Sequence, residues 1–212
     1  MSAPVVVERQ SLTDRLLACG LVAGPLFVVV FLLEGVFKGA GYDVLRHPVS
    51  SLALGAGGWV QVVNFLVAGV LTMAFSVGVW RSGYRVGAVL IGVWGLGLLG
   101  AGLFTTDPVS GFPLGTPATS DYTASGALHD GFSLPAFLAL FVAQLVLSRG
   151  NGRRWLAYSL LSATAFLVCF FLASAGFNQT AGLVAVGGLF QRLAVVIGWG
   201  FTVALAVRLR RT

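Results

Sequence analysis

Long apolar stretches alternate with short polar ones along the whole chain. A helix that crosses the hydrocarbon core of a bilayer needs about 20 mostly apolar residues. Six stretches reach this length, at residues 16–37, 59–80, 85–104, 127–148, 155–175 and 187–208. Backbone polar groups in lipid must be satisfied within the chain, so continuous stretches of this kind predict helices. The pattern therefore predicts an all-α integral membrane bundle of six transmembrane helices, occupying residues 1–212 as a single domain.

The composition agrees with a membrane protein and excludes other classes. Of the 212 residues, 57% are hydrophobic and only 9% are charged, whereas a soluble domain carries roughly 25% charged residues. A water-soluble enzyme and a disordered segment are therefore excluded. The formal net charge of +6 does not indicate nucleic-acid binding, because the basic residues lie in short clusters between the apolar stretches. Membrane lipids are the expected partners, and no nucleic acid is expected.

The distribution of charge predicts how the chain lies in the membrane. One end of the predicted bundle carries most of the basic residues, namely Arg9, Arg15, Arg81, Arg85, Arg149, Arg153, Arg154, Arg208, Arg210 and Arg211, against Glu8 and Asp14. The other end carries Lys38, Arg46 and Arg192 against Glu34, Asp43, Asp107, Asp121 and Asp130. Because Lys and Arg favour the cytoplasmic side, both termini are expected in the cytoplasm. The composition, rich in Gly, Ala, Val and Arg, suggests a bacterial plasma membrane.

Two outer connections, at residues 38–58 and 105–126, are much longer than the cytoplasmic ones. Structureless loops of such length are uncommon and often functional. Asp107 lies at the start of the second connection, and His129 and Asp130 lie just after its end. Ionisable groups near membrane depth are costly and are therefore candidates for function. The structural alternative is that Asp107 caps a turn while His129 and Asp130 lie among the lipid head groups.

The first outer connection contains a predicted short helix. Pro48 and Gly55 stand where helices commonly begin and end. We expect an interfacial helix there, with His47, Ser50 and Ser51 on one face. The alternative is a structural helix whose serines satisfy its own backbone.

Arg192 lies one to two turns inside the last predicted span, where it needs a partner or must extend to the interface. Glu34, near the outer end of the first span, is its expected ion-pair partner, with Asp107 and Asp130 as rivals. The alternative role for Arg192 is a contact with an anionic substrate. The amides expected to add hydrogen bonds to the same chamber are Gln61, Asn64 and Gln191.

One motif is misleading. Residues Gly95 to Gly100 spell G-x-G-x-x-G, which in a dinucleotide-binding protein follows a strand and opens a helix. Here it lies inside a membrane span, where small residues let neighbouring helices approach closely. We interpret it as a helix-packing motif.

Several short motifs occur together in a fixed order. They are R-H-P-x-S-S-L-x-L-G at residues 46–55, G-x-F-x-x-D at residues 102–107, and a histidine that opens the fourth span. With the six-span layout, this combination resembles the bacterial and archaeal membrane family known as domain of unknown function 998, over residues 16–205. Thr105 stands where the family usually has a proline. The resemblance implies the six-span fold and no activity, and the residues that it highlights are His47, Ser50, Asp107 and His129.

The favoured hypothesis is a membrane enzyme that acts on a lipid or isoprenoid in a polar pocket of the outer leaflet. A buried carboxyl or imidazole can serve there as a general acid or base, in a cyclisation or a hydrolysis. The expected catalytic residues are Glu34, His47, Asp107, His129 and Asp130. The expected substrate-binding residues are Ser50, Ser51, Gln61, Asn64, Gln191 and Arg192.

Two variants of this hypothesis add a reactive group. A hydrolytic variant uses Ser50 or Ser51 with His129 and an aspartate from another segment. A metal variant uses His47 and His129 with Asp107 or Asp130 to hold a divalent ion. No HxxxH or HExxH motif supports the second variant, so no cofactor is predicted and the metal remains an alternative.

Two other classes of function fit the same pattern. A lipid-binding or accessory subunit of a larger membrane complex would need only the glycine-rich faces and the apolar spans. A transporter would need polar groups near the middle of the spans, where the chain offers few, so this class is less favoured.

Overall fold

The computed structural model of the protein describes residues 3–39, 41–118, 122–150 and 152–211, and Asp121 lies outside them. Every regular element in these ranges is helical, which confirms the all-α prediction. Six helices are long and apolar enough to cross a membrane. They are α1 (Ala3–Phe37), α2 (Trp59–Arg81), α3 (Arg85–Leu103), α4 (Ala124–Val146), α5 (Arg153–Phe177) and α6 (Gly187–Leu209).

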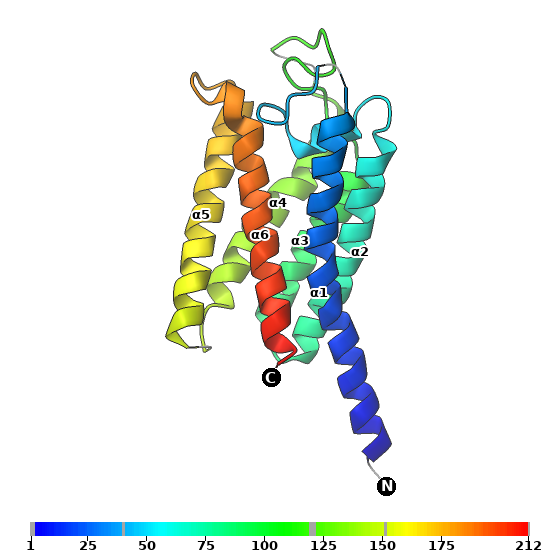
Figure 1. Ribbon diagram of the computed structural model, residues 1–212, viewed down its shortest axis with the longest axis vertical. Helices are drawn as coiled ribbons and strands as arrows, with labels where there is room; N and C mark the ends of the chain where they lie inside the picture. Colours follow the sequence, from blue (N-terminus) through cyan, green and yellow to red (C-terminus); the bar gives the residue numbers. More distant parts are fainter. Residues whose placement is uncertain (1–2, 40, 119–121, 151, 212) are drawn as a thin grey trace.

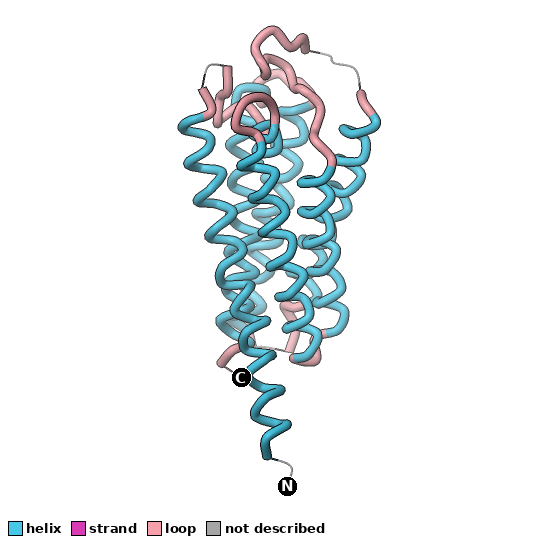
Figure 2. Tube along the Cα trace, turned by 90° about the vertical axis from the view of Figure 1, so that its right-hand side faces the viewer, coloured by secondary structure: helices cyan, strands magenta, loops and turns pink. Residues whose placement is uncertain are grey.

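The six helices form a ring of neighbours (Figure 1). Each helix packs on the next along the chain, and α1 packs on α6 to close the ring. The chain begins and ends at the same end of this bundle, and the long connections gather at the other end (Figures 1 and 2). Two chain ends on the same side agree with an even number of membrane crossings, such as the six expected. The assignment of the arginine-rich end to the cytoplasm remains a prediction.

Most of the helices begin and end within a few residues of the expected spans, and α1 extends well beyond its span. Helix α1 begins at Ala3 instead of residue 16, and its first turns project beyond the other helices (Figure 2). The expectation followed hydropathy, but a helix does not have to end where its apolar stretch ends. Helix α4 begins at Ala124, because the Thr123 hydroxyl accepts a hydrogen bond of 3.1 Å from the Gly126 N–H and caps the first turn.

The predicted short helix in the first outer connection is present as η1, a 3₁₀ helix at Val49–Ala53. The expectation that His47, Ser50 and Ser51 share one of its faces is wrong. His47 precedes the helix, and a 3₁₀ helix has three residues per turn, so consecutive side chains diverge. Ser51 is buried, whereas Ser50 is only half-buried.

Aromatic side chains fill the centre of the half of the bundle that carries the long connections. Trp199 of α6 lies edge-on to Trp94 of α3, with ring centroids 5.6 Å apart, and also contacts Phe27 of α1. A separate apolar cluster around Phe75 and Phe201 fills the other half. Helices α3 and α4 approach each other so closely that a methyl group on Gly97 of α3 would collide with Ala136 of α4. This close approach supports the helix-packing interpretation of the glycine motif.

We predict that Gly97→Ala lowers the free energy of unfolding by about 1–3 kcal/mol, the range for overpacking a tight contact. The added methyl would also lie 2.9 Å from the Phe132 carbonyl oxygen. Thermal unfolding of the detergent-solubilised protein measures the change. Gly92→Ala on the same helix is the matched control, because its methyl would meet nothing nearer than Ser76 Oγ at 3.6 Å. Equal losses in both variants would contradict the packing argument.

Candidate functional site

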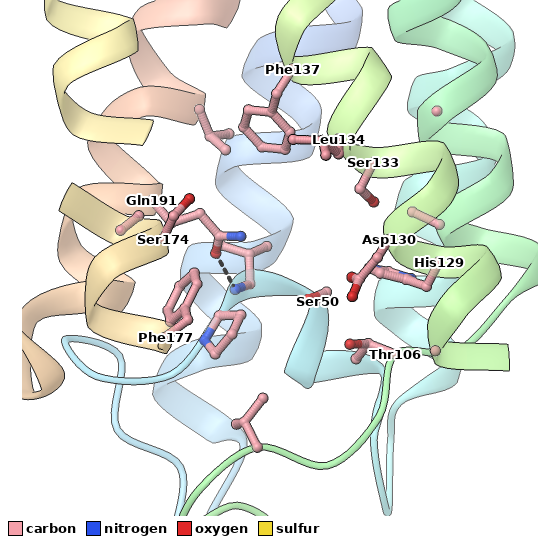
Figure 3. Close-up of a pocket in the computed structure, with 18 of the residues that line it drawn as sticks. Ser50, Thr106, His129, Asp130, Ser133, Leu134, Phe137, Ser174, Phe177 and Gln191 are labelled. Carbon is pink, nitrogen blue, oxygen red and sulfur yellow. Dashed lines mark hydrogen bonds between the residues drawn. The ribbon is translucent and has the colours of Figure 1, made fainter. Parts of the chain in front are cut away.

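A cavity of about 480 Å³ lies between α4 on one side and α5 and α6 on the other, near the end with the long connections (Figure 3). All six membrane helices contribute to its lining, and the first outer connection and the segment after α3 complete the wall. The polar residues of the lining are Ser50, Thr106, Asp107, Tyr122, His129, Asp130, Ser133, Ser174, Asn178 and Gln191.

Asp107 holds the start of α4 in place at the edge of this cavity. Its carboxylate accepts a hydrogen bond of 2.9 Å from the Thr123 N–H and another of 2.6 Å from the Thr123 hydroxyl. Gly126 allows this approach, because a methyl group there would collide with the carboxylate. Asp107 therefore supports the capping residue of a helix that carries much of the cavity wall.

His129, on the first turns of α4, is only 4% exposed. Its Nδ1 lies 2.8 Å from the Phe104 carbonyl oxygen. Because a carbonyl can only accept, Nδ1 carries a proton, and in the neutral ring Nε2 then carries the lone pair. Phe65 of α2 packs edge-on against the imidazole, with centroids 6.3 Å apart. The ring is thus held in one orientation at the cavity wall, with one nitrogen suited to accept a proton.

Asp130 projects from α4 toward the same cavity as His129 (Figure 3). Its carboxylate accepts a hydrogen bond of 2.9 Å from the Tyr122 hydroxyl. This bond holds the phenolic proton and raises the pKa of Tyr122. Both side chains are exposed, so Asp130 supplies negative charge at the rim, where water can solvate it.

Gln191 attaches the first outer connection to α6. Its Oε1 accepts a hydrogen bond of 2.7 Å from the Val49 N–H, the dashed line in Figure 3. Ser50 follows directly and lines the cavity opposite Asp130 (Figure 3). Within the described residues, no hydrogen bond joins Ser50 or Ser51 to His129. A serine–histidine pair is therefore not assembled in this conformation.

The inner part of the cavity is apolar. Phe137 lies 13 residues along α4 from Ala124, which corresponds to about 20 Å at 1.5 Å per residue. The apolar residues of the lining include Phe27, Trp94, Leu98, Phe137, Phe170 and Val195. The cavity is therefore polar at its rim and apolar toward the centre of the bundle.

Sequence reasoning missed several polar residues of this wall, including Ser133, Ser174 and Asn178. A helical period offers the only signal for them. Ser174 stands four residues after Phe170 on the same face of α5, and Asn178, the residue that caps the end of α5, follows four residues later. That face could be assigned to a cavity only once the packing of α5 against α4 and α6 was known.

Arg192 does not line the cavity, and its expected ion pair with Glu34 is wrong. The guanidinium instead donates hydrogen bonds to the carbonyl oxygens of His47 (2.9 Å) and Gly188 (3.0 Å) and to the Tyr42 hydroxyl (2.6 Å). Neither Asp107 nor Asp130 pairs with it in the described structure. Arg192 therefore fastens the first outer connection to α6.

His47 belongs to this fastening and lies outside the cavity lining. Its Nδ1 accepts a hydrogen bond of 2.9 Å from the Asp43 N–H, and its ring packs against Tyr42 and Phe112. Burial disfavours the charged ring and lowers the pKa of His47; the neighbouring Ser110 carbonyl opposes this shift, although it makes no hydrogen bond of good geometry with Nε2. A neutral, accepting imidazole is a structural part of the loop.

The remaining candidate residues also lie elsewhere. Asn64 donates hydrogen bonds to the Phe27 carbonyl (3.1 Å) and to Gln61 Oε1 (3.2 Å), between α1 and α2. Glu34 pairs with Lys38 on α1 at 3.6 Å. The chamber expected from the sequence is therefore split, and Glu34, His47, Ser51, Gln61, Asn64 and Arg192 do not line the cavity.

The proposed metal ligands do not gather. Among the described residues, no group of three or more His, Cys, Asp or Glu side chains could hold a metal ion. His129 lies at the cavity and His47 in the loop cluster, each with a ring nitrogen engaged by the backbone.

The fold and the cavity together define a multi-pass membrane protein with a chamber that is polar at its rim and apolar inside. A family model described as "Protein of unknown function (DUF998)" matches residues 21–208, and the chain belongs to this family. No curated protein and no solved structure matches the chain. Membership confirms the resemblance seen in the motifs and assigns no activity.

We predict that Asp107→Ala lowers the free energy of unfolding by about 1–2 kcal/mol, because Thr123, the capping residue of α4, loses the charged acceptor of its N–H and hydroxyl. Thermal unfolding in detergent, with hydrogen exchange at the start of α4, measures the loss. Asp130→Ala is the control, since in the described part of the chain its carboxylate binds the exposed Tyr122 hydroxyl and not the capping residue of α4, and it should change stability by less than about 0.5 kcal/mol. An Asp107→Ala protein as stable as the wild type would show that the carboxylate is not needed for the fold.

Proposed function

We propose that the protein binds a lipid-like amphiphile in this cavity, with the head group at the polar rim and the chain in the apolar interior. The change in character of the lining along the cavity is the observation that carries the proposal. Asp107, Tyr122 and Asp130 supply the rim, and Trp94 and Phe137 supply the interior. The volume of about 480 Å³ falls in the range of roughly 300–1,000 Å³ that is usual for small-molecule sites.

In this proposal the arginine-rich end faces the cytoplasm of a bacterium, so the cavity belongs to the outer half of the membrane. Leu134 supports a route into it from the lipid. This residue lines the cavity and is 52% exposed on α4. A lipid or isoprenoid from the outer leaflet would therefore meet an apolar side chain of the cavity wall at the surface of α4.

A second candidate function is acid–base chemistry on the head group of the bound amphiphile. The fixed ring of His129 favours it, because Nδ1 is engaged by the Phe104 carbonyl and Nε2 of the neutral ring is a base. The carboxylate of Asp130 stands on the next residue and faces the same space. A non-enzymatic lipid-binding or accessory subunit would use the same cavity without this chemistry.

We predict that a lipid carrying a photoactivatable diazirine in its acyl chain labels the cavity in proteoliposomes. Peptides from the cavity-facing parts of α3, α4 and α5 should carry the label, and an excess of unmodified bacterial lipid extract should reduce it. Ala101→Phe, which puts a large ring at a buried position of the lining, should lower this labelling by about tenfold.

Leu161→Phe is the matched control for the labelling experiment. Leu161 is 72% exposed on α5 and does not line the cavity. Its variant should be labelled like the wild type, and peptides that only face the surrounding lipid should be labelled equally in all three proteins. Unchanged labelling of the cavity peptides in Ala101→Phe, with an unchanged melting temperature, would contradict the binding proposal.

The histidine can be tested with a variant that separates structure from chemistry. In His129→Asn the amide can replace Nδ1 as the donor to Phe104, but nothing replaces Nε2. Incubation with liposomes of bacterial lipid extract, followed by mass spectrometry of the lipids, should show a product with the wild type and at least about 100-fold less with this variant. Turnover in both proteins would exclude His129 as the base, and turnover in neither would favour the binding subunit.

A further inference from the structure

A second hollow lies on the other side of the first outer connection. This groove, of about 420 Å³, runs between the outer end of α1 and the start of α2. It shares no lining residue with the cavity described above. Its walls are apolar, formed by Val30, Leu33, Phe37 and Val60, and several of these side chains face outward. Two charged residues of α1, Glu34 and Lys38, complete the lining.

Lys38 has its hydrogen-bonding capacity occupied. Its ammonium donates to the carbonyl oxygen of Leu52 and, at 3.2 Å, to that of Ala56. The remaining N–H is available to Glu34, which forms an ion pair with Lys38 at 3.6 Å. An ammonium group has three donors, so Lys38 holds the loop and has little capacity to bind a ligand.

Glu34 is in the opposite situation. Its side chain is only 9% exposed. Both carboxylate oxygens are buried, and within the described structure neither accepts a hydrogen bond. The ion pair with Lys38 neutralises the charge, but its distance of 3.6 Å exceeds that of a hydrogen bond. Buried acceptors without donors are costly, so the ion pair beside the groove has unused acceptor capacity. Because protein atoms cover both oxygens, a donor in the groove reaches them once the Glu34 side chain turns toward it.

We propose that this groove binds the hydroxyl group of an uncharged lipid alcohol, such as a diacylglycerol, which donates a hydrogen bond to Glu34. The apolar walls accept its chains, and the unused acceptors require a donor. An anionic head group needs donors that Lys38 has already committed. An ammonium head group would add a positive charge to a pair that is already neutral. A neutral hydroxyl can donate a hydrogen bond to Glu34 without adding charge to the ion pair.

Native mass spectrometry of the purified protein tests this proposal. The probes are dioleoylglycerol and its methyl ether, which has the same chains but no hydroxyl donor. The wild type should retain dioleoylglycerol at concentrations about tenfold below those needed for the ether, the usual effect of a hydrogen bond to a charged group. Equal retention of the two probes would overturn the proposal.

Two variants locate the site. Glu34→Leu should abolish the discrimination between the probes, because a leucine side chain has no acceptor for the hydroxyl. Val60→Phe, which fills the groove without changing Glu34 or Lys38, should weaken the binding of both probes. Val70→Phe is the control on the same helix, at a position that is 60% exposed and outside the groove. Thermal unfolding confirms that each variant is folded.

The result also separates this groove from the main cavity. Ala101→Phe should leave the discrimination between dioleoylglycerol and its methyl ether unchanged, because the hydroxyl is recognised by Glu34 in the groove. A loss of retention shared by both probes would belong to the main cavity. If Ala101→Phe removes the binding and Val60→Phe does not, the alcohol occupies the main cavity and the groove proposal is wrong.

Discussion

The attachment of the first outer connection to α6 is the constraint on which the outer half of the structure depends. Arg192 binds the His47 carbonyl and the Tyr42 hydroxyl, and the adjacent Gln191 accepts from the Val49 N–H. These bonds cross the bundle between segments that are far apart in sequence. They place Pro48, Val49 and Ser50 in the cavity wall. Without them the cavity would lose one side.

This attachment explains why a buried arginine is tolerated. Arg192 is 8% exposed and has no carboxylate partner in the described structure, so its charge is stabilised by neutral dipoles. Its guanidinium also lies 5.9 Å from the ring centre of Phe31 and 5.8 Å from that of Tyr42, within cation–π range. A planar guanidinium with several donors can satisfy all these groups at once, whereas a lysine could not.

The fold could be predicted from sequence because the bilayer sets a length that each span must reach, and each of the six stretches reaches it. The site could be predicted only in part. Asp107, His129 and Asp130 flank one loop, and the chain itself brings them to the same cavity. The partner of Arg192 could not be predicted, since opposite charge favoured Glu34 while the loop geometry presented carbonyl groups. Ser174 was missed because its polarity is common in spans and only packing shows which face it occupies.

The two hollows at this end of the molecule share the first outer connection as a wall, and a cation holds that connection on each side. Arg192 binds the His47 carbonyl beside the cavity, and Lys38 binds the Leu52 and Ala56 carbonyls beside the groove. Because backbone carbonyls bind these cations, the nearby carboxylates among the described residues do not bind them through hydrogen bonds. The two carboxylates also differ in their own hydrogen-bond partners. Asp107 accepts hydrogen bonds at the start of α4, whereas neither carboxylate oxygen of Glu34 accepts one within the described structure. The first outer connection is thus held from both sides, and the two hollows that it separates share no lining residue.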